Sequence, residues 1–351
     1  MEALAQAHRI RQLASSNPMD RLAILRFLLA LVYWCKGNPP DGQDSVSSFP
    51  SDWFKRLNSC SEHFDLLSGE KRFYQYKRSA TEKKLSANYL VQEVPTGTNC
   101  WHFRHSIDGF DGLCMACCAV GLLRLPIFAT SGGRGKPPGV NSKPPIYAVP
   151  LGRSLAETLR LSWGSVSEED LGTPAWERPE FRLPTVGNIP VLAGLTWLPR
   201  RVWLDDPGEP KANCASCGRK GLLVRRMVFA PIGSMKNETS DVSRSWSDPH
   251  TIHDGNDVLK PGNALDASDA GAGQWTRTAA GALEKHQGVC DVWSVGFATV
   301  QNDKYLEAME FIIPDISFPD AQDIQERVAR IKRWEQGADR LARRVAHAAP
   351  Q

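Results

Sequence analysis

The sequence has no long apolar segment. Its longest apolar run is Phe27–Cys35, whereas a helix that spans a membrane needs about 20 apolar residues. The first residues, M-E-A-L-A-Q-A-H-R-I-R, form a charged helical pattern and lack the apolar core of a signal peptide. We therefore expect a cytoplasmic protein.

The motifs of the common enzyme classes are also missing. The chain contains no G-x-S-x-G elbow, no Walker phosphate loop, no H-E-x-x-H zinc motif and no dinucleotide-binding fingerprint. No segment of solenoid length repeats itself, which argues against a repeat protein. The net charge of +3 is too small to indicate a partner, so any nucleic-acid surface must be a local one.

What is present is the composition of a globular protein with a large core. The chain has 351 residues, of which 42% are hydrophobic and 23% are charged. Residues 17–36 predict a buried helix, because Asn17 suits its N-cap, Pro18 suits its first turn and apolar residues lie almost all round it. Other helix and strand patterns are present too. The predicted fold class is therefore α+β.

The remaining elements divide the chain in two. We expect further helices over Trp53–Leu67, Asp111–Leu125 and 154–163, and strands over 146–150, 194–204, 221–230 and 292–301. Residues 233–290 are predicted to form loops with short elements. From Asp320 to His347, apolar residues at steps of three and four predict a long helix. We expect a globular domain over residues 1–318 and a C-terminal helix over 319–351.

The cysteines are grouped rather than evenly spread. Nine cysteines without a secretory signal argue against a disulfide framework. Cys114 and Cys117 form one C-x-x-C pair, and Cys214 and Cys217 form a second, far away in the sequence. Two such pairs can surround one tetrahedral zinc ion. Although both pairs could be buried thiols, we predict a structural Zn²⁺ site in a zinc-ribbon-like element near residues 200–230, with Cys118 in the core.

A second cluster, S-D-P-H-T-I-H-D, offers other metal ligands. Asp248, His250, His253 and Asp254 could hold the catalytic ion of a zinc-dependent hydrolase if all four met in one pocket. Asp-Pro-His is more often a turn, in which the aspartate has a capping role. The sequence leaves both interpretations open.

One loop is rich in glycine, proline and cations. Residues 131–145, S-G-G-R-G-K-P-P-G-V-N-S-K-P-P, contain Arg134, Lys136 and Lys143 and no acidic residue. Glycine lets a backbone approach a nucleic acid closely, and the cations attract phosphate. Composition alone favours an ordinary flexible loop equally.

Short motifs follow one another along nearly the whole chain. Each is weak alone, but their order and spacing together are specific. They are G-T-N-C (97–100), G-L-C-M-A-C-C-A (112–119), the glycine-rich loop, P-A-W-E-R-P (174–179), G-L-T-W-L-P (194–199), L-D-D-P (204–207), C-A-S-C-G (214–218), W-S-D-P-H (246–250) and G-F-A-T-V-Q (296–301). The series resembles the large subunit of the type I-E CRISPR surveillance complex Cascade, the CasA family.

The resemblance implies a non-catalytic subunit for antiviral defence. Members sit near the crRNA 5′ handle, recognise the protospacer-adjacent motif (PAM) in double-stranded DNA, help to open the duplex and recruit a helicase-nuclease. The four cysteines match the family's two C-x-x-C pairs. For contact with DNA and the PAM, the resemblance implies the loop residues Gly132, Gly133, Arg134 and Gly135, and Gln301 as a wedge that splits the first base pairs. It also implies a lysine, best matched by Lys236, with Arg225 and Arg226 as alternatives. For the crRNA handle and neighbouring subunits it implies Asn99, Trp101 and Phe103.

The chain also departs from the family's pattern. The usual N-terminal strand region is missing, and one long helix stands where members have a four-helix bundle. We therefore expect a compact variant in which another subunit, or a nuclease fused to one, supplies what is absent. The alternatives are the hydrolase above and a zinc-ribbon RNA-processing factor, which would bind single strands without a PAM.

Overall fold

The computed structural model describes most of the chain up to residue 317. The described residues are 2–40, 48–76, 82–91, 112–129, 139–141, 145–178, 188–230, 246–254, 257–258, 274–275, 289–300 and 304–317. Helices and strands both occur among them, as the α+β prediction requires. None of the helices in these ranges has the length and apolar character that crossing a lipid bilayer demands.

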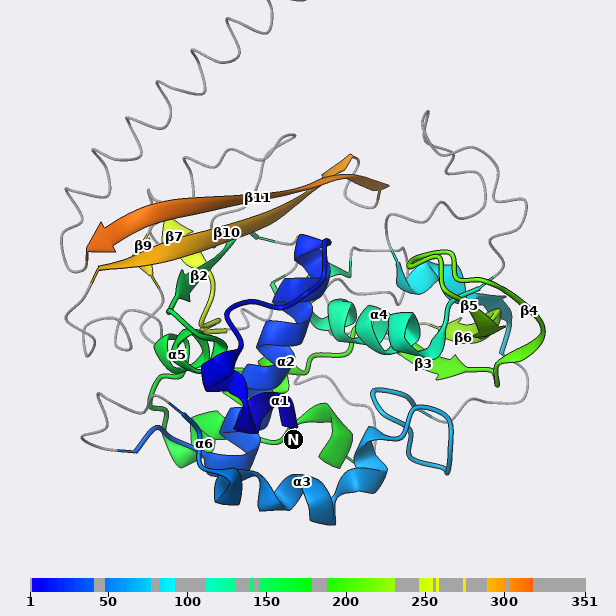
Figure 1. Cartoon of the computed structure of the whole chain (residues 1–351), viewed down its shortest axis with the longest axis horizontal. Coiled ribbons are helices and arrows are strands. Elements are labelled where there is room, and N and C mark those ends of the chain that lie inside the picture. The colour runs from blue at the N-terminus through cyan, green and yellow to red at the C-terminus, as the bar shows by residue number, and fades with distance from the viewer. Residues whose placement is uncertain are drawn as a thin grey trace, which may run out of the picture.

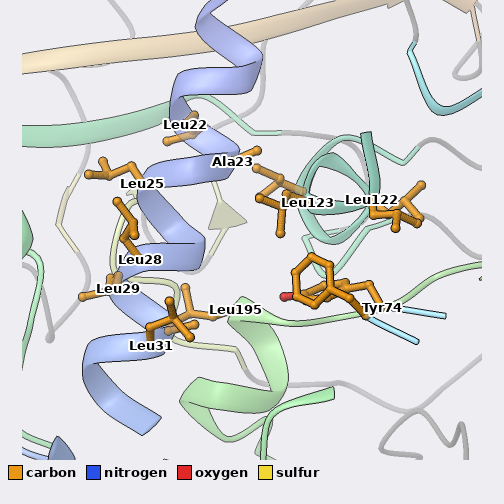
Figure 2. Close-up of a cluster of buried hydrophobic side chains, with 14 of the residues drawn as sticks. Leu22, Ala23, Leu25, Leu28, Leu29, Leu31, Tyr74, Leu122, Leu123 and Leu195 are labelled. Atoms are coloured by element: carbon orange, nitrogen blue, oxygen red, sulfur yellow. The ribbon is translucent and has the colours of Figure 1, made fainter. Parts of the chain in front are cut away.

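Helix α2 (Pro18–Lys36) runs through the middle of the fold (Figure 1). The Asn17 side chain accepts a hydrogen bond from the Met19 N–H at 2.8 Å, so the predicted N-cap is confirmed. The helix ends at Gly37, which has φ of +76° and donates its N–H to the Tyr33 carbonyl. Its leucines are buried on several sides (Figure 2), which explains why almost every position is apolar.

Helix α4 (Met115–Phe128) packs against α2. Figure 2 shows Leu122 and Leu123 on α4, with Leu123 facing α2 near Ala23. Buried apolar side chains of this kind each contribute about 1.5–3 kcal/mol when removed from water. Helices α2 and α4 therefore both contribute to the main hydrophobic core.

The strands in the described part of the chain form four small sheets. In the first, β10 (Val289–Val300) lies between β2 (Tyr147–Leu151) and β11 (Lys304–Ser317), with antiparallel pairing on both sides. The second has the order β1-β6-β3, the third is the hairpin β4–β5, and the fourth has the order β8-β7-β9. Their bounds are β1 Lys84–Ser86, β3 Arg201–Leu204, β4 Gly208–Asn213, β5 Lys220–Leu223, β6 Arg226–Ala230, β7 Ile252–Asp254, β8 Asp257–Val258 and β9 Gln274–Trp275.

The remaining helices of the described residues are short. The α-helices are α1 Glu2–Ala5, α3 Lys55–Ser59, α5 Leu155–Leu161, α6 Glu168–Leu171 and α7 Val191–Leu195; the 3₁₀ turns are Ala7–Arg9, Ser51–Phe54, Ser61–Phe64, Ala87–Leu90 and Ala175–Glu177. In α5, the Ser154 side chain accepts a hydrogen bond from the Glu157 N–H, and it is the N-cap.

Several predicted boundaries were wrong, for local reasons. The helix expected from Asp111 begins at Met115, because Leu113 pairs with Val224 as a β-bridge instead. The strand expected over 194–204 is only β3, and its start overlaps helix α7. The helix expected over Trp53–Leu67 is split into two 3₁₀ turns around α3.

Strands β4 and β11 were not predicted. Lys304–Ser317 mixes charged and apolar residues, and its pairing with β10 decides its structure. The predicted C-terminal helix, and with it the division at residue 318, lies outside the described residues and remains a prediction.

Candidate metal centre and buried polar network

Two distant segments meet next to the four cysteines. Leu113 and Val224 exchange both backbone hydrogen bonds, at 3.0 and 2.9 Å, and Ala215 donates its N–H to the Gly112 carbonyl at 3.0 Å. Gly112 has φ of +138°, and a Cβ there would lie 2.5 Å from the Val224 oxygen. Only glycine therefore allows this close approach.

Each C-x-x-C pair sits on a turn that directs its sulfurs to the same side. Cys114 is the N-cap of α4 and Cys117 lies in its first turn. In the second pair, Cys214 accepts the Gly218 N–H on its carbonyl and donates its own N–H to the Arg219 carbonyl, both at 2.9 Å. Gly218 has φ of +71°, which the tight turn between β4 and β5 requires.

The four sulfurs form one group. The Sγ atoms of Cys114, Cys117, Cys214 and Cys217 all lie within 4.8 Å of one another, and those of Cys114 and Cys217 are 3.7 Å apart. A zinc ion with Zn–S bonds of about 2.3 Å holds its thiolates about 3.8 Å apart, whereas a disulfide needs about 2.05 Å. The spacing therefore fits a tetrahedral metal ion, as the sequence predicted, and not a disulfide.

The thiols are not equivalent. The Cys117 side chain is hydrogen-bonded to Cys214 and lowers the pKa of that thiol, in spite of its burial. The same bond, together with burial, raises the pKa of Cys117. The Cys114 N–H also points at the Cys214 sulfur, at 3.3 Å. Such N–H donors favour a thiolate, which is the form that binds a metal.

The four cysteines and their neighbours differ in exposure: Cys114 and Cys117 are half-buried, and Cys217 is exposed. Cys118 is fully buried, so its predicted place in the core is confirmed. Arg219 and Lys220 are exposed. Cys214 is fully buried. Within the described residues, these four cysteines are the single group of three or more metal-ligating side chains.

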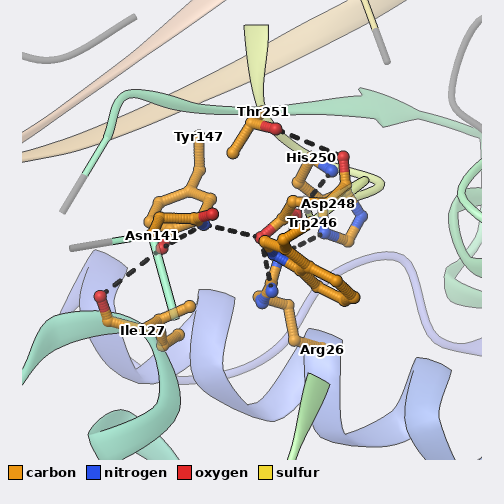
Figure 3. A network of polar contacts seen from close by, with 8 residues as sticks. All are labelled: Arg26, Ile127, Asn141, Tyr147, Trp246, Asp248, His250 and Thr251. Atoms are coloured by element: carbon orange, nitrogen blue, oxygen red, sulfur yellow. Dashed lines mark hydrogen bonds and ion pairs between the residues drawn. The ribbon is translucent and has the colours of Figure 1, made fainter. Parts of the chain in front are cut away.

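A second site lies around Asp248, in the motif that also suggested a hydrolase (Figure 3). Its carboxylate accepts hydrogen bonds from Arg26 Nη1 at 2.5 Å and Nη2 at 2.8 Å, from Asn141 Nδ2 at 2.8 Å, from Trp246 Nε1 at 3.0 Å and from the His250 N–H at 2.9 Å. An ionised carboxylate offers about four acceptor sites. Both oxygens are therefore fully used.

The ionisation of this network follows from its contacts. Burial opposes a charge on Asp248, but Arg26 outweighs it and lowers the pKa of Asp248 to about 2. Burial and the charge of Arg26 lower the pKa of His250 to about 3. Arg26 Nη1 lies 3.2 Å from His250 Nδ1, which must accept because arginine only donates. His250 is therefore neutral, with its proton on Nε2.

This arrangement does not support the hydrolase. Asp248 and His250 are fully buried, and the carboxylate is neutralised by Arg26 rather than open to an ion. The side chains of His253 and Asp254 lie outside what the structure describes. The alternative interpretation, in which Asp-Pro-His is a turn, agrees better with the structure. The Asp248 side chain accepts a hydrogen bond from the His250 N–H, and the Asp248 backbone carbonyl accepts one from the Thr251 N–H.

Sequence reasoning missed Arg26, Asn141 and Trp246 as parts of this network. A signal for the first was present, because Arg26 is a single cation within the apolar run A-I-L-R-F-L-L. A cation in such a position must find a buried partner. Arg124, inside the apolar G-L-L-R-L-P of α4, follows the same rule and pairs with Asp20.

Comparison with known protein families identifies the family of this chain. The family model described as CRISPR-associated protein Cse1 matches residues 1–265. The chain belongs to the Cse1 family. A curated Cse1 relative, the CRISPR-associated protein CasA/Cse1 of Thermus thermophilus, is 28% identical over 230 residues. That match covers 59% of this chain but only 45% of the relative, so the chain spans about half of that protein.

Solved Cse1 structures share the fold. A crystal structure of Thermus thermophilus CasA has a TM-score of 0.69 at 23% identity and covers 100% of this chain and 76% of its own. Thermobifida fusca Cse1 has a TM-score of 0.61 at 19% identity and covers 89% and 68%. A chain of a CRISPR RNA-guided surveillance complex has a TM-score of 0.66 at 18% identity and covers 99% and 77%.

Within this Cse1 chain, the remaining predicted site residues fall outside the described ranges. These are Asn99, Trp101, Phe103, Gly132, Gly133, Arg134, Gly135, Lys236 and Gln301. Of the predicted site residues, the structure thus brings together the four cysteines. The roles of the others remain predictions.

Proposed function

We propose that this chain is the large subunit of a type I-E CRISPR surveillance complex. In this role it recognises the PAM in double-stranded DNA, promotes opening of the duplex for pairing with the crRNA and helps to recruit the nuclease. It catalyses no reaction itself. The observation that carries the proposal is membership of the Cse1 family over residues 1–265.

The glycine-rich loop is the proposed contact with the PAM. Gly132, Gly133, Arg134 and Gly135 provide close backbone approach and a cation, and Lys236 provides a second cation. A protein that recognises only a short motif and duplex shape, while the crRNA supplies sequence specificity, needs little more. Support comes from the stem of this loop, whose two ends, Ala129 and Gly139, are hydrogen-bonded at 2.7 Å.

Gln301 is the proposed wedge in the first base pairs. It follows β10 directly, and the last residue of β10, Val300, pairs with Lys304 of β11. A wedge must be supported by a rigid element to hold base pairs apart. The long β10–β11 hairpin is such a support.

The other partners follow from the same proposal. Asn99, Trp101 and Phe103 contact the crRNA handle and neighbouring subunits, and the nuclease that the complex recruits is a helicase-nuclease or a nuclease fused to another subunit. The cytoplasmic location is part of the proposal, because crRNA and DNA targets are there. The metal ion held by the four cysteines is zinc, with a structural role.

The test is DNA binding by the complex reconstituted with this chain, across a duplex library with a randomised PAM. Gln301→Ala should lower affinity for closed duplexes. Gly133→Asp should change the motif preference, because a side chain at this position blocks the close approach of the backbone to the base edges. Gly221→Asp is a matched control, since Gly221 lies in the β4–β5 hairpin with open space around it. Unchanged affinity for closed duplexes in Gln301→Ala, together with unchanged motif preference in Gly133→Asp, contradicts the proposal. Binding of single strands regardless of a PAM would favour the RNA-processing factor.

A further inference from the structure

The two ends of the glycine-rich loop meet at the end of α4. Gly139 donates its N–H to the Ala129 carbonyl at 2.7 Å, and Val140 donates to the Pro126 carbonyl at 3.0 Å. A Cβ on Gly139 would lie 2.8 Å from the Pro126 oxygen, so only glycine fits there. The loop 130–138 is thus closed at its base by described residues.

Asn141 links this base to the buried network. Two residues beyond Gly139, its Nδ2 donates to Asp248 at 2.8 Å and to the Tyr147 hydroxyl at 3.4 Å. The Tyr147 hydroxyl in turn donates to the Ile127 carbonyl on α4, at 3.4 Å (Figure 3). The chain leaving the loop is therefore tied both to α4 and to Asp248.

Asp248 is itself held by buried contacts. Arg26 binds both of its oxygens in a bidentate pair, and Arg26 lies on α2, the helix at the centre of the fold. The arginine and the aspartate are 2% and 0% exposed, so neither can rearrange toward solvent. The hydrogen bond between Asn141 and Asp248 therefore links the base of the loop to α2.

A buried ion pair is a poor device for stability alone. Its desolvation cost often equals its Coulombic gain, and well-packed apolar residues frequently stabilise as much. What such a pair provides is a directed contact of fixed geometry. Here the Asp248 carboxylate, which Arg26 holds, accepts a hydrogen bond from Asn141.

We infer that Asp248, held by Arg26, is a positioning residue for duplex recognition, which acts through Asn141 on the base of the glycine-rich loop. The inference rests on the proposed function of that loop. Recognition through close backbone approach needs placement within about 0.5 Å. A loop whose base can shift would still bind DNA through its cations, but it would distinguish motifs less well.

The decisive variant is Asn141→Ala in the reconstituted complex. It leaves Asp248 with Arg26, Trp246 and the His250 N–H, so the fold should persist. We expect the ratio of dissociation constants for PAM-less and PAM-bearing duplexes to fall about tenfold, the equivalent of one hydrogen bond. Asn141→Asp, which has the same shape but places a carboxylate against Asp248, should reduce the ratio at least as much.

Two controls separate positioning from general damage. A target with a pre-opened bubble needs no PAM recognition, so its affinity should be unchanged in both variants. Asn38→Ala removes a similar side chain just beyond the far end of α2, where Asn38 bonds to Val166, and it should leave the ratio unchanged. An unchanged ratio in both Asn141 variants, or an equal loss on the bubble target, overturns the inference.

The outcome is distinguishable from failure of the proposed function. If Gly133→Asp leaves the motif preference intact, the loop does not recognise the PAM and the proposed function fails. If Gly133→Asp alters the preference and the Asn141 variants do not, the loop recognises DNA without help from Asp248. Only the inference is then wrong.

Discussion

The cysteine cluster and the Asp248 network both join segments that are far apart in the sequence, but they do so in opposite ways. The four sulfurs lie within 4.8 Å of one another and offer four ligand atoms to one ion. Asp248, by contrast, has Arg26 as a counter-charge and five hydrogen bonds. The first group is complete only when an ion is bound, and the second is complete from the chain's own side chains.

The difference predicts different responses to outside conditions. A site of thiolates is sensitive to chelators and oxidants, because its binding energy is also folding energy. A buried ion pair with a neutral histidine beside it is insensitive to chelators but sensitive to the loss of either partner and to acid. Three measurements test this contrast between the two groups.

The largest effect is expected from Cys214→Ser, at the most buried ligand of the cluster. The variant should lose its metal, and its free energy of unfolding should fall by several kcal/mol. The reason is that the binding free energy of a structural zinc ion, about 10 kcal/mol, is also folding free energy. Metal content per chain and thermal unfolding measure both. Cys118→Ala is the matched control, since Cys118 is equally buried but outside the cluster, and it should keep the metal. A metal-free wild type would contradict the zinc proposal.

An intermediate effect is expected from separating the buried pair. Arg26→Met leaves the Asp248 carboxylate without its counter-charge, which should cost about 3–5 kcal/mol in urea unfolding. The double variant Arg26→Met with Asp248→Leu should recover much of that loss, because no charge is then buried. The exposed pair of Lys55 and Asp52 is the control, where the same kind of change should cost at most about 1 kcal/mol. Equal losses in the single and double variants would refute the coupling.

The smallest effect is a dependence on pH. The pKa of His250 is lowered to about 3 in the folded protein, whereas an unfolded histidine has a pKa of about 6.5. The unfolded state therefore binds a proton below about pH 6.5 that the folded state does not, and stability falls with pH down to about 3. From about pH 7 to about pH 5.5, wild type should lose about 1 kcal/mol more than His250→Asn. Identical pH profiles of the two proteins in urea unfolding would show that folding does not lower the pKa of His250.

The two groups also differ in how far they could be predicted. The cysteines were recognisable from sequence because C-x-x-C spacing is local, and two such pairs have a known way to combine. The meeting of Asp248 with Arg26 has no local pattern, since 222 residues separate them. The W-S-D-P-H motif identified the segment. The carboxylate oxygens of Asp248, however, contact side chains that only the tertiary fold brings near.

Local patterns explain the elements that were predicted correctly. Asn17 and Pro18 determine the start of α2, and continuous burial explains its leucines. The shortfalls, such as the start of α4 and the strands β4 and β11, occur where long-range pairing overrides propensity. Leu113 could continue the helix of its neighbours, but its hydrogen bonds go to Val224.

The α+β class, the helix α2, the two cysteine pairs and the resemblance to the Cse1 family could be predicted from the sequence alone, because each depends on residues close together or on an ordered series. The meeting of the four sulfurs within 4.8 Å and the burial of Asp248 against Arg26 depend on the tertiary structure. The physical reason is that a carboxylate's role is set by what surrounds it. Burial with Arg26, Asn141 and Trp246 uses both of its oxygens, and no spacing along the chain reveals that.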